Sequence, residues 1–263
     1  MLTVMTLNIW NYEGPWEARL PLIRDWISLL DPDVIALQEV LHGAAFDQAS
    51  QIFDGFDYYR SYAAGMDYWN DTSLRFGNLV ASRWPFVSEE TIELPLGRES
   101  DQRVLLATHI DRPGGLLSFS TTHLSSAPHE GALRERQAQV VAETILRRRT
   151  KNGTPSIFCG DFNATPDSAE IRYLKGLQAL GGKSAFFTDA WELAGDGSAG
   201  LTFTRRNHYL TETLINDRRL DYIFVEALPA GKGRVRGCDL VCHVPRHGIY
   251  PSDHFGLTAR IDI

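Results

Sequence analysis

Residues 156–163 have the sequence SIFCGDFN, in which a short apolar run is followed directly by polar side chains. Residues 156–159 come after a Gly-Thr-Pro turn signal and are apolar enough to predict a buried β-strand. Asp161 and Asn163 stand where this strand would leave its sheet. The stretch therefore predicts a strand whose end presents a carboxylate and an amide at the rim of a sheet.

Similar strand signals occur along the whole chain. Runs rich in β-forming residues lie at residues 2–10, 34–37, 79–82, 104–110, 116–122, 220–225 and 256–263. Gly114-Gly115, between two of these runs, is typical of a hairpin turn. These signals predict a protein in which strands outnumber helices.

Apolar residues at helical spacing predict helices over about residues 20–30 and 132–149. Pro21 is compatible with the first helix only in its opening turn. The buried residues expected in the second helix are Leu133, Val140, Val141 and Ile145. Asp167 begins a capping pattern that predicts a third helix ending at Leu180. Helices interspersed among strands predict sheets packed on each other with helices outside.

The composition is that of a globular protein. The 263 residues are 43% hydrophobic and 22% charged, which excludes disorder and predicts one domain over residues 1–263. The apolar runs are too short to cross a bilayer, so no membrane span is expected, and residues 1–10 do not resemble a secretory signal. Three cysteines cannot form a disulfide framework and fit a reducing compartment. A cytoplasmic location is therefore expected.

The net charge of −7 argues mildly against tight, sequence-independent binding of duplex nucleic acid, which usually needs a basic surplus. The basic run at residues 147–151 is interpreted as the solvated end of a helix. A small phosphate ester or a single-stranded nucleic acid remains compatible with this charge.

Polar side chains recur at the ends of the expected strands. They are Asn8, Glu39, His123, Asp161, Asn163, Asp221, Asp253 and His254. One aspartate after a strand is more often a turn residue than a ligand, but so many strand ends of this kind indicate a shared site.

These residue types together fit the hydrolysis of a phosphate ester. Carboxylates such as Glu39 and Asp161 are the ligands that Mg²⁺ prefers. A histidine with a carboxylate partner, such as His254 or His123, can serve as a base or as a positive stabiliser. Asparagine amides can contact phosphate oxygens without adding negative charge. The sequence therefore predicts an activated water attacking a phosphodiester.

Six short motifs resemble those of the endonuclease/exonuclease/phosphatase superfamily, in the family's order and across residues 6–254. They are Thr6-Leu7-Asn8, Leu37-Gln38-Glu39-Val40, Thr122-His123-Leu124, Gly160-Asp161-Phe162-Asn163, Leu220-Asp221-Tyr222-Ile223 and Ser252-Asp253-His254. Secondary cues at residues 122–126, 134–137, 189–192 and 251–254 look similar to the branch of tyrosyl-DNA phosphodiesterase 2, whereas residues 7–10 look more like the sphingomyelinase side. The resemblance implies a four-layered α/β/β/α sandwich of two mostly antiparallel sheets with helices outside.

The resemblance also implies a Mg²⁺-dependent phosphoesterase, with Mn²⁺ as a possible substitute, and a role for each motif residue. The implied metal ligands are Glu39, the principal one, with Asn8, Asp161 and Asp253. The implied catalytic residues are His123, Asp161, Asn163, Asp221, Asp253 and His254, in which Asp221 would hold a histidine. Asn163 and His123 would contact the substrate phosphate. His123 stands where the abasic endonucleases of the family look to carry a tyrosine. The resemblance therefore argues against membership of that branch.

Some interpretations stay open at this point. Arg103 could bind phosphate bidentately or could be a surface or salt-bridged arginine. The substrate could be a nucleic acid, as in nucleases and tyrosyl-DNA phosphodiesterases, or a sphingomyelin or inositol phosphate. A non-catalytic module that binds phosphorylated ligands is a further alternative, and no obligate protein partner is predicted. The aromatic patch from Tyr58 to Trp69 is expected to pack under a loop rather than to stack on a ligand.

Overall fold

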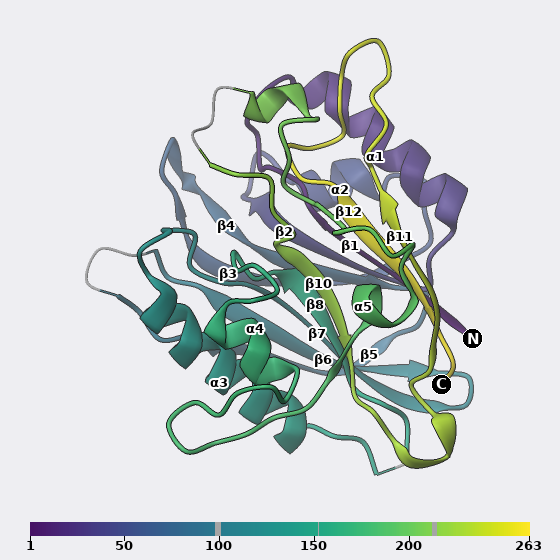
Figure 1. The fold of residues 1–263 in the computed structure, drawn as a ribbon. Coiled ribbons are helices and arrows are strands. Elements are labelled where there is room, and N and C mark those ends of the chain that lie inside the picture. Colours follow the sequence, from purple (N-terminus) through teal and green to yellow (C-terminus); the bar gives the residue numbers. More distant parts are fainter. Residues whose placement is uncertain (98–100, 152, 212–214) are drawn as a thin grey trace.

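The computed structural model describes residues 1–97, 101–151, 153–211 and 215–263, and their strands form two six-stranded sheets (Figure 1). The first sheet contains β1 (Leu2–Asn8), β2 (Val34–His42), β3 (Tyr59–Tyr68), β4 (Asp71–Ser82), β11 (Val235–Val241) and β12 (Gly256–Ile261). The second contains β5 (Phe86–Glu93), β6 (Val104–Arg112), β7 (Gly115–His123), β8 (Ile157–Asp161), β9 (Thr188–Asp189) and β10 (Asp221–Val225).

The strand orders are β11-β12-β1-β2-β4-β3 and β5-β6-β7-β8-β10-β9. The pairs β1–β2 and β7–β8 are parallel, and the other neighbouring strands are antiparallel. The mostly antiparallel arrangement is therefore confirmed, as is the hairpin at Gly114-Gly115, where both glycines have positive φ.

The two sheets pack face to face, and helices cover both outer faces (Figure 1). One layer consists of α1 (Trp16–Leu30) and α2 (Gln48–Ile52), which pack on the first sheet. The opposite layer consists of α3 (Gly131–Arg147) and α4 (Ala169–Leu174), which pack on the second sheet. The short helix α5 (Ala190–Ala194) adds Trp191 to the core between the sheets. The predicted α/β/β/α sandwich is confirmed.

Several local predictions are wrong. Because α1 begins at Trp16, Pro21 lies in its second turn rather than its first. The helix expected to reach Leu180 ends at Leu174, and its N-cap is Ser168 rather than Asp167, with no side-chain cap. In α3, Val140 is only partly buried, whereas the other three expected residues are buried. Among the described residues, no helix is long and apolar enough to cross a membrane.

The aromatic patch lies mostly in β3, and the expected packing role is confirmed for Tyr58, Tyr62 and Tyr68, whereas Tyr59 and Trp69 are exposed. β3 forms an edge of the first sheet, where pairing with β4 supplies the backbone hydrogen bonds. The edge strand β5 and the strand β11 were not expected either. The burial of β5 alternates between intermediate and exposed, so its sequence lacks the apolar run that marked the inner strands.

Arg19, on α1, is fully buried and holds the loop that follows β1. Its guanidinium donates hydrogen bonds to the backbone carbonyls of Ile9, Trp10, Asn11, Glu13 and Pro251. Burial lowers the pKa of Arg19 to about 10, and the charge of Asp253 opposes this effect. The side chain therefore ties the loop after β1 to the segment that leads into β12.

We expect Arg19→Met to lower the free energy of unfolding by about 3 kcal/mol, because it leaves several buried carbonyls without a donor. Chemical denaturation followed by circular dichroism measures the loss. Arg60→Met, at an exposed position of β3, serves as the control and should change stability little. Equal stabilities of the two variants would contradict the role assigned to Arg19.

The three cysteines, Cys159, Cys238 and Cys242, are buried and unpaired. Burial raises the pKa of Cys238 to about 12 and also raises the pKa of Cys159 and Cys242 above the ordinary value. Since the thiolate is the reactive form, we expect DTNB to modify none of them in the native protein at about pH 8. All three should react in concentrated guanidinium chloride. Rapid modification of a thiol in the native protein would show that this part of the core opens readily.

Candidate active site

The inward-facing positions of five strands change from apolar to polar at one end of the sandwich. Side chains alternate along a strand, so every second residue faces the opposite sheet. From core to rim, these positions are Val4, Thr6 and Asn8 in β1, Ala36 and Gln38 in β2, Phe119, Thr121 and His123 in β7, Cys159 and Asp161 in β8, and Ile223 and Asp221 in β10. The same alternation that builds the core therefore places polar groups at its end.

Strand direction brings these ends together. The carboxyl ends of the parallel pair β1 and β2 meet at one rim, as do those of β7 and β8. The antiparallel strands β10 and β12 begin at this rim. The register sets His123 beside Asp161, and Asp161 beside Asp221. The segment 252–254 enters the same rim just before β12.

Glu39 reaches the site through a bulge in β2. The register shifts between Leu37 and Val40, and Glu39 has a φ of 62°. A bulge of this kind turns a side chain away from the alternation of its strand. Glu39 Oε1 accepts a hydrogen bond from Asn8 Nδ2 at 3.1 Å, and Asn8 Nδ2 also donates to Asp161 Oδ2 at 3.1 Å. Asn8 therefore bridges carboxylates from the two sheets.

Two histidines surround the same carboxylate. His123 Nε2 lies 3.4 Å from Asp161 Oδ2, and His254 Nε2 lies 3.7 Å from that oxygen. The other ring nitrogen of His254, Nδ1, is 2.8 Å from Asp221 Oδ2. Asp221 thus orients His254 so that its Nε2 faces Asp161.

Hydrogen bonds hold the segment that carries His254. Ser252 Oγ donates to the carbonyl of Asn8 at 2.6 Å. Asn207 Nδ2 donates to the carbonyls of Ser252, at 2.7 Å, and Asp253, at 3.1 Å. The Asp253 side chain accepts from Ser252 Oγ at 3.2 Å and lies close enough to Glu39 for their charges to interact.

Burial dominates the electrostatics of the rim. It raises the pKa of Asp161 to about 7 and that of Asp253 to about 6, while His254 opposes both shifts. Burial alone would lower the pKa of His254, but Asp221, followed by Asp161 and Asp253, raises it well above the ordinary value. Burial, Arg103 and His254 lower the pKa of His123. The two imidazoles therefore differ in their preferred protonation state.

The backbone after β8 is shaped to place Asp161 and Asn163. Gly160 has a φ of 141°, and a Cβ there would lie 1.9 Å from the carbonyl oxygen of Thr122. Only glycine lets β8 approach β7 this closely. Asn163 adopts a positive φ of 50°, its amide N–H donates to Asp161 Oδ1 at 2.8 Å, and its Nδ2 donates to the carbonyl of Leu124.

Arg103 is a buried member of this cluster rather than a surface residue, with a 7% exposed side chain. Its Nη1 lies 3.1 Å from His123 Nδ1, and its Nη2 donates to Ser126 Oγ at 3.3 Å. Asp101 Oδ2 lies 3.9 Å from Arg103 Nη2. The positive charge of Arg103 therefore stands next to the histidine that faces Asp161.

The structure also adds residues that the sequence did not single out. Asn11 Nδ2 donates to Glu39 Oε2 at 2.8 Å, so both oxygens of Glu39 accept from amides. Gln38 links the sheets by donating to Thr121 Oγ1 at 2.9 Å. Asn207 is buried under the segment 252–254. Asn11 follows a strand end in the same way as the predicted residues, whereas no sequence signal points to Asn207.

Two groups of side chains have the donor types for a divalent cation. The first is Glu39 with Asp161, whose carboxylate oxygens are the hard donors that Mg²⁺ prefers. Asn8 turns its Nδ2 toward both carboxylates, and its Oδ1 accepts a hydrogen bond from the Trp10 N–H. The second is Asp161 with Asp221 and His254, whose ligand atoms lie within 4.8 Å of one another. In the second group, His254 and Asp221 already satisfy each other through a hydrogen bond. In the first group, both oxygens of Glu39 likewise accept hydrogen bonds from amides. Asp161 is common to both groups.

Comparisons with known proteins agree with this arrangement. A model of the endonuclease/exonuclease/phosphatase family matches residues 5–254. The chain is 27% identical to tyrosyl-DNA phosphodiesterase 2 of Homo sapiens, covering 99% of this chain and 69% of that protein. It is 29% identical to nocturnin of Xenopus laevis, covering 92% of this chain and 63% of that protein. The crystal structure of D. rerio TDP2 complexed with single strand DNA product is similar in fold, with a TM-score of 0.79, 24% identity and coverage of 98% and 97%.

Proposed function

The chain belongs to the endonuclease/exonuclease/phosphatase family, and on this premise we propose that it is a Mg²⁺-dependent phosphodiesterase of the tyrosyl-DNA phosphodiesterase type. The observation that carries the proposal is the convergence of Glu39, Asp161 and His254 on one rim, with Asn8 joining the two carboxylates. A metal-dependent phosphodiesterase needs these groups within reach of one phosphate.

Glu39, Asp161 and Asn8 would hold the cation, with Asp253 close by and Mn²⁺ as a substitute. The carboxylate oxygens of Glu39 and Asp161 support this assignment, because they suit a hard divalent ion. One buried oxygen of Asp221, Oδ1, has no hydrogen-bond partner, which marks a further acceptor at this rim. The bound ion supplies positive charge that polarises the phosphate.

The protein's own residues would position the reactants. Asp161 and Asn163 orient the attacking water and the phosphate, and their geometry is held by the hydrogen bond between the Asn163 N–H and Asp161 Oδ1. His254, fixed by Asp221, faces the reacting phosphate and stabilises charge or moves the water's proton. His123 and Arg103 together offer donors to phosphate oxygens or to the leaving oxygen.

A 5′-phosphodiester of a nucleic acid, in particular a tyrosyl ester, is the proposed substrate. The sequence similarity to tyrosyl-DNA phosphodiesterase 2, over nearly the whole chain, supports it. Residues 1–263 would act as one domain, and the unpaired cysteines favour a reducing compartment such as the cytoplasm.

A substrate panel tests the proposal. We expect turnover of bis-p-nitrophenyl phosphate with Mg²⁺ or Mn²⁺, loss of turnover with EDTA, and the fastest reaction on 5′-tyrosyl DNA. Abasic duplex, poly(A), sphingomyelin and inositol phosphates are the comparison substrates. Faster turnover of either of the last two would reassign the substrate class. An absence of turnover on the whole panel would favour a non-catalytic module that binds phosphorylated ligands.

A further inference from the structure

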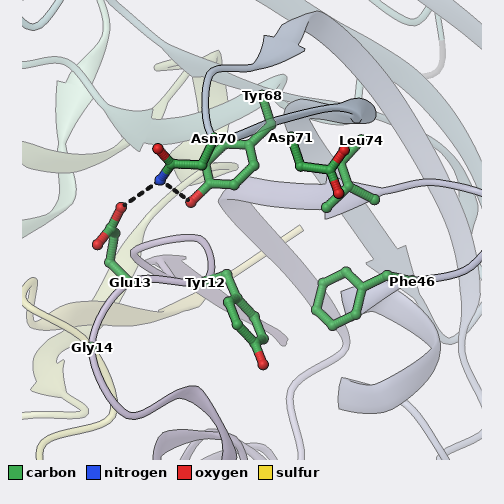
Figure 2. A pocket seen from close by; sticks show the side chains of 8 residues that line it. All are labelled: Tyr12, Glu13, Gly14, Phe46, Tyr68, Asn70, Asp71 and Leu74. Carbon is green, nitrogen blue, oxygen red and sulfur yellow. Dashed lines mark hydrogen bonds between the residues drawn. The ribbon is translucent and has the colours of Figure 1, made fainter.

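The cavity next to the loop after β1 contributes no positive charge to the site. It has a volume of about 560 Å³, and its described lining residues include the carboxylates of Glu13 and Asp71 and no basic side chain (Figure 2). Asn70 Nδ2 donates a hydrogen bond to Glu13 Oε1 at 3.3 Å and so holds this carboxylate beside the cavity (Figure 2). A phosphate is an anion, so the positive side chains that attract it must come from other segments of the rim.

Arg218 is a positive side chain that has no partner of its own. Two arginines that neighbour it are each paired with a buried carboxylate: Arg134 donates to Glu170 Oε1 at 2.8 Å, and Arg219 donates to Asp189 Oδ2 at 2.7 Å. Within the described parts of the chain, nothing accepts a hydrogen bond from the partly buried guanidinium of Arg218, and its Nε is buried without a partner. This guanidinium can therefore bind an anion without breaking an existing ion pair.

The local fold places Arg218 on the His254 side of the rim. Its Cζ lies 5.5 Å from the centre of the Phe203 ring, and that ring lies 4.9 Å from the His254 ring. The backbones of Phe203 and Arg218 exchange two hydrogen bonds, of 2.9 Å and 2.7 Å. Thr202 Oγ1 accepts a hydrogen bond from the Asp221 N–H at 3.2 Å. The segment that presents Arg218 is therefore fixed to the start of β10.

The charge of Arg218 acts on the carboxylate at the centre of the rim. Burial lowers the pKa of Arg218, whereas the charge of Asp161 raises it. The two side chains therefore lie close enough for their charges to interact. Arg103, beside His123, acts on Asp161 from the other sheet-edge side, since His123 and His254 both face the same oxygen of Asp161. A phosphate that Asp161 orients comes within reach of both arginines.

We propose that Arg218 is a phosphate-binding residue that donates hydrogen bonds to a non-bridging oxygen of the phosphate held at Asp161. The proposal rests on the proposed phosphodiesterase function and adds a residue to its site. The planar fork of a guanidinium matches the oxygens of a phosphate, and its charge offsets the negative charge that develops in the transition state. The Phe203 ring supports the guanidinium, which keeps the donors at its edge available to the ligand.

Three variants test the assignment. Arg218→Met keeps an unbranched apolar chain against Phe203 and removes the charged donors. Arg218→Lys keeps the positive charge but lacks the planar fork. Arg206→Met is the matched control, because Arg206 is an exposed arginine of the same segment. The melting temperature of each variant shows whether its fold is retained.

The substrate is bis-p-nitrophenyl phosphate, which contains a single phosphate. We expect Arg218→Met to lower kcat/KM about tenfold to a hundredfold, the loss typical of a hydrogen bond to a charged group, and Arg218→Lys to restore part of it. Arg206→Met should match wild type. Equal kcat/KM values for wild type and Arg218→Met would overturn the proposal. A loss confined to a substrate with a second phosphate, such as the dinucleotide pTpT, would also overturn it, because Arg218 would then bind an adjacent phosphate.

A binding measurement separates this proposal from the proposed function. Affinity for p-nitrophenyl phosphate, measured by calorimetry in the presence of Ca²⁺, requires no turnover. If wild type hydrolyses no substrate and Arg218→Met still weakens binding about tenfold or more while Arg206→Met does not, the phosphodiesterase function fails and the role of Arg218 stands. If Arg218→Met binds this probe as tightly as wild type does, the assignment of Arg218 is wrong.

Discussion

Glu39→Gln should lower metal-dependent turnover roughly 10³-fold or more while leaving the fold intact, because a polarising cation is worth several kcal/mol in the transition state. Glutamine can replace neither the charge nor the second anionic oxygen of the carboxylate. The bulge backbone of β2 and the amide donors of Asn8 and Asn11 stay in place. Initial rates on bis-p-nitrophenyl phosphate across a Mn²⁺ titration measure the effect, and calorimetric Mn²⁺ binding should weaken in parallel.

The matched control is Glu90→Gln. Glu90 is a partly buried residue of β5 that pairs with Arg147 and Arg148, and the substitution removes its charge. Its rate and Mn²⁺ affinity should equal those of wild type. Circular dichroism and the melting temperature of Glu39→Gln show whether its fold is retained. Full activity of Glu39→Gln in the presence of a chelator would refute the metal site.

His254→Gln should lower kcat by about 10² to 10⁴, the range expected for a group that transfers a proton or stabilises developing charge. The side chain is held by Asp221 at 2.8 Å and faces Asp161, so its loss removes a group at the reacting phosphate. Asp221→Asn should also lower kcat, because the amide cannot hold a protonated imidazole as the carboxylate does. Single-turnover rates at saturating substrate measure both effects.

Mn²⁺ binding distinguishes the two candidate donor groups. If Glu39, Asp161 and Asn8 hold the cation, His254→Gln keeps Mn²⁺ affinity within a few fold of wild type while its rate collapses. If Asp161, Asp221 and His254 hold it, affinity and rate fall together, and the assignment to Glu39 is wrong. His129→Gln, at an exposed histidine before α3, is the control and should leave both quantities unchanged.

Most of the site could be predicted from the sequence because it is built from strand ends. Asn8, His123 and Asp161 each sit at the last position of a strand, and Asp221 at the first. The apolar runs before or after them identified those strands, since inner strands bury both faces and therefore read as continuous apolar segments. The edge strand β5 was missed for the opposite reason, because its polar sequence depends on pairing with β6.

By itself, the sequence determined the layered fold class and the residue types gathered at the rim, because apolar periodicity and strand-end chemistry are local properties of the chain. Tertiary structure alone decided how Glu39 is aimed, since the bulge in β2 appears only against its partner β4. It also decided that Asn11 supports Glu39 and that Arg19 ties residue 251 to the loop after β1. Each of these features depends on contacts between segments far apart in the chain, which no local pattern encodes.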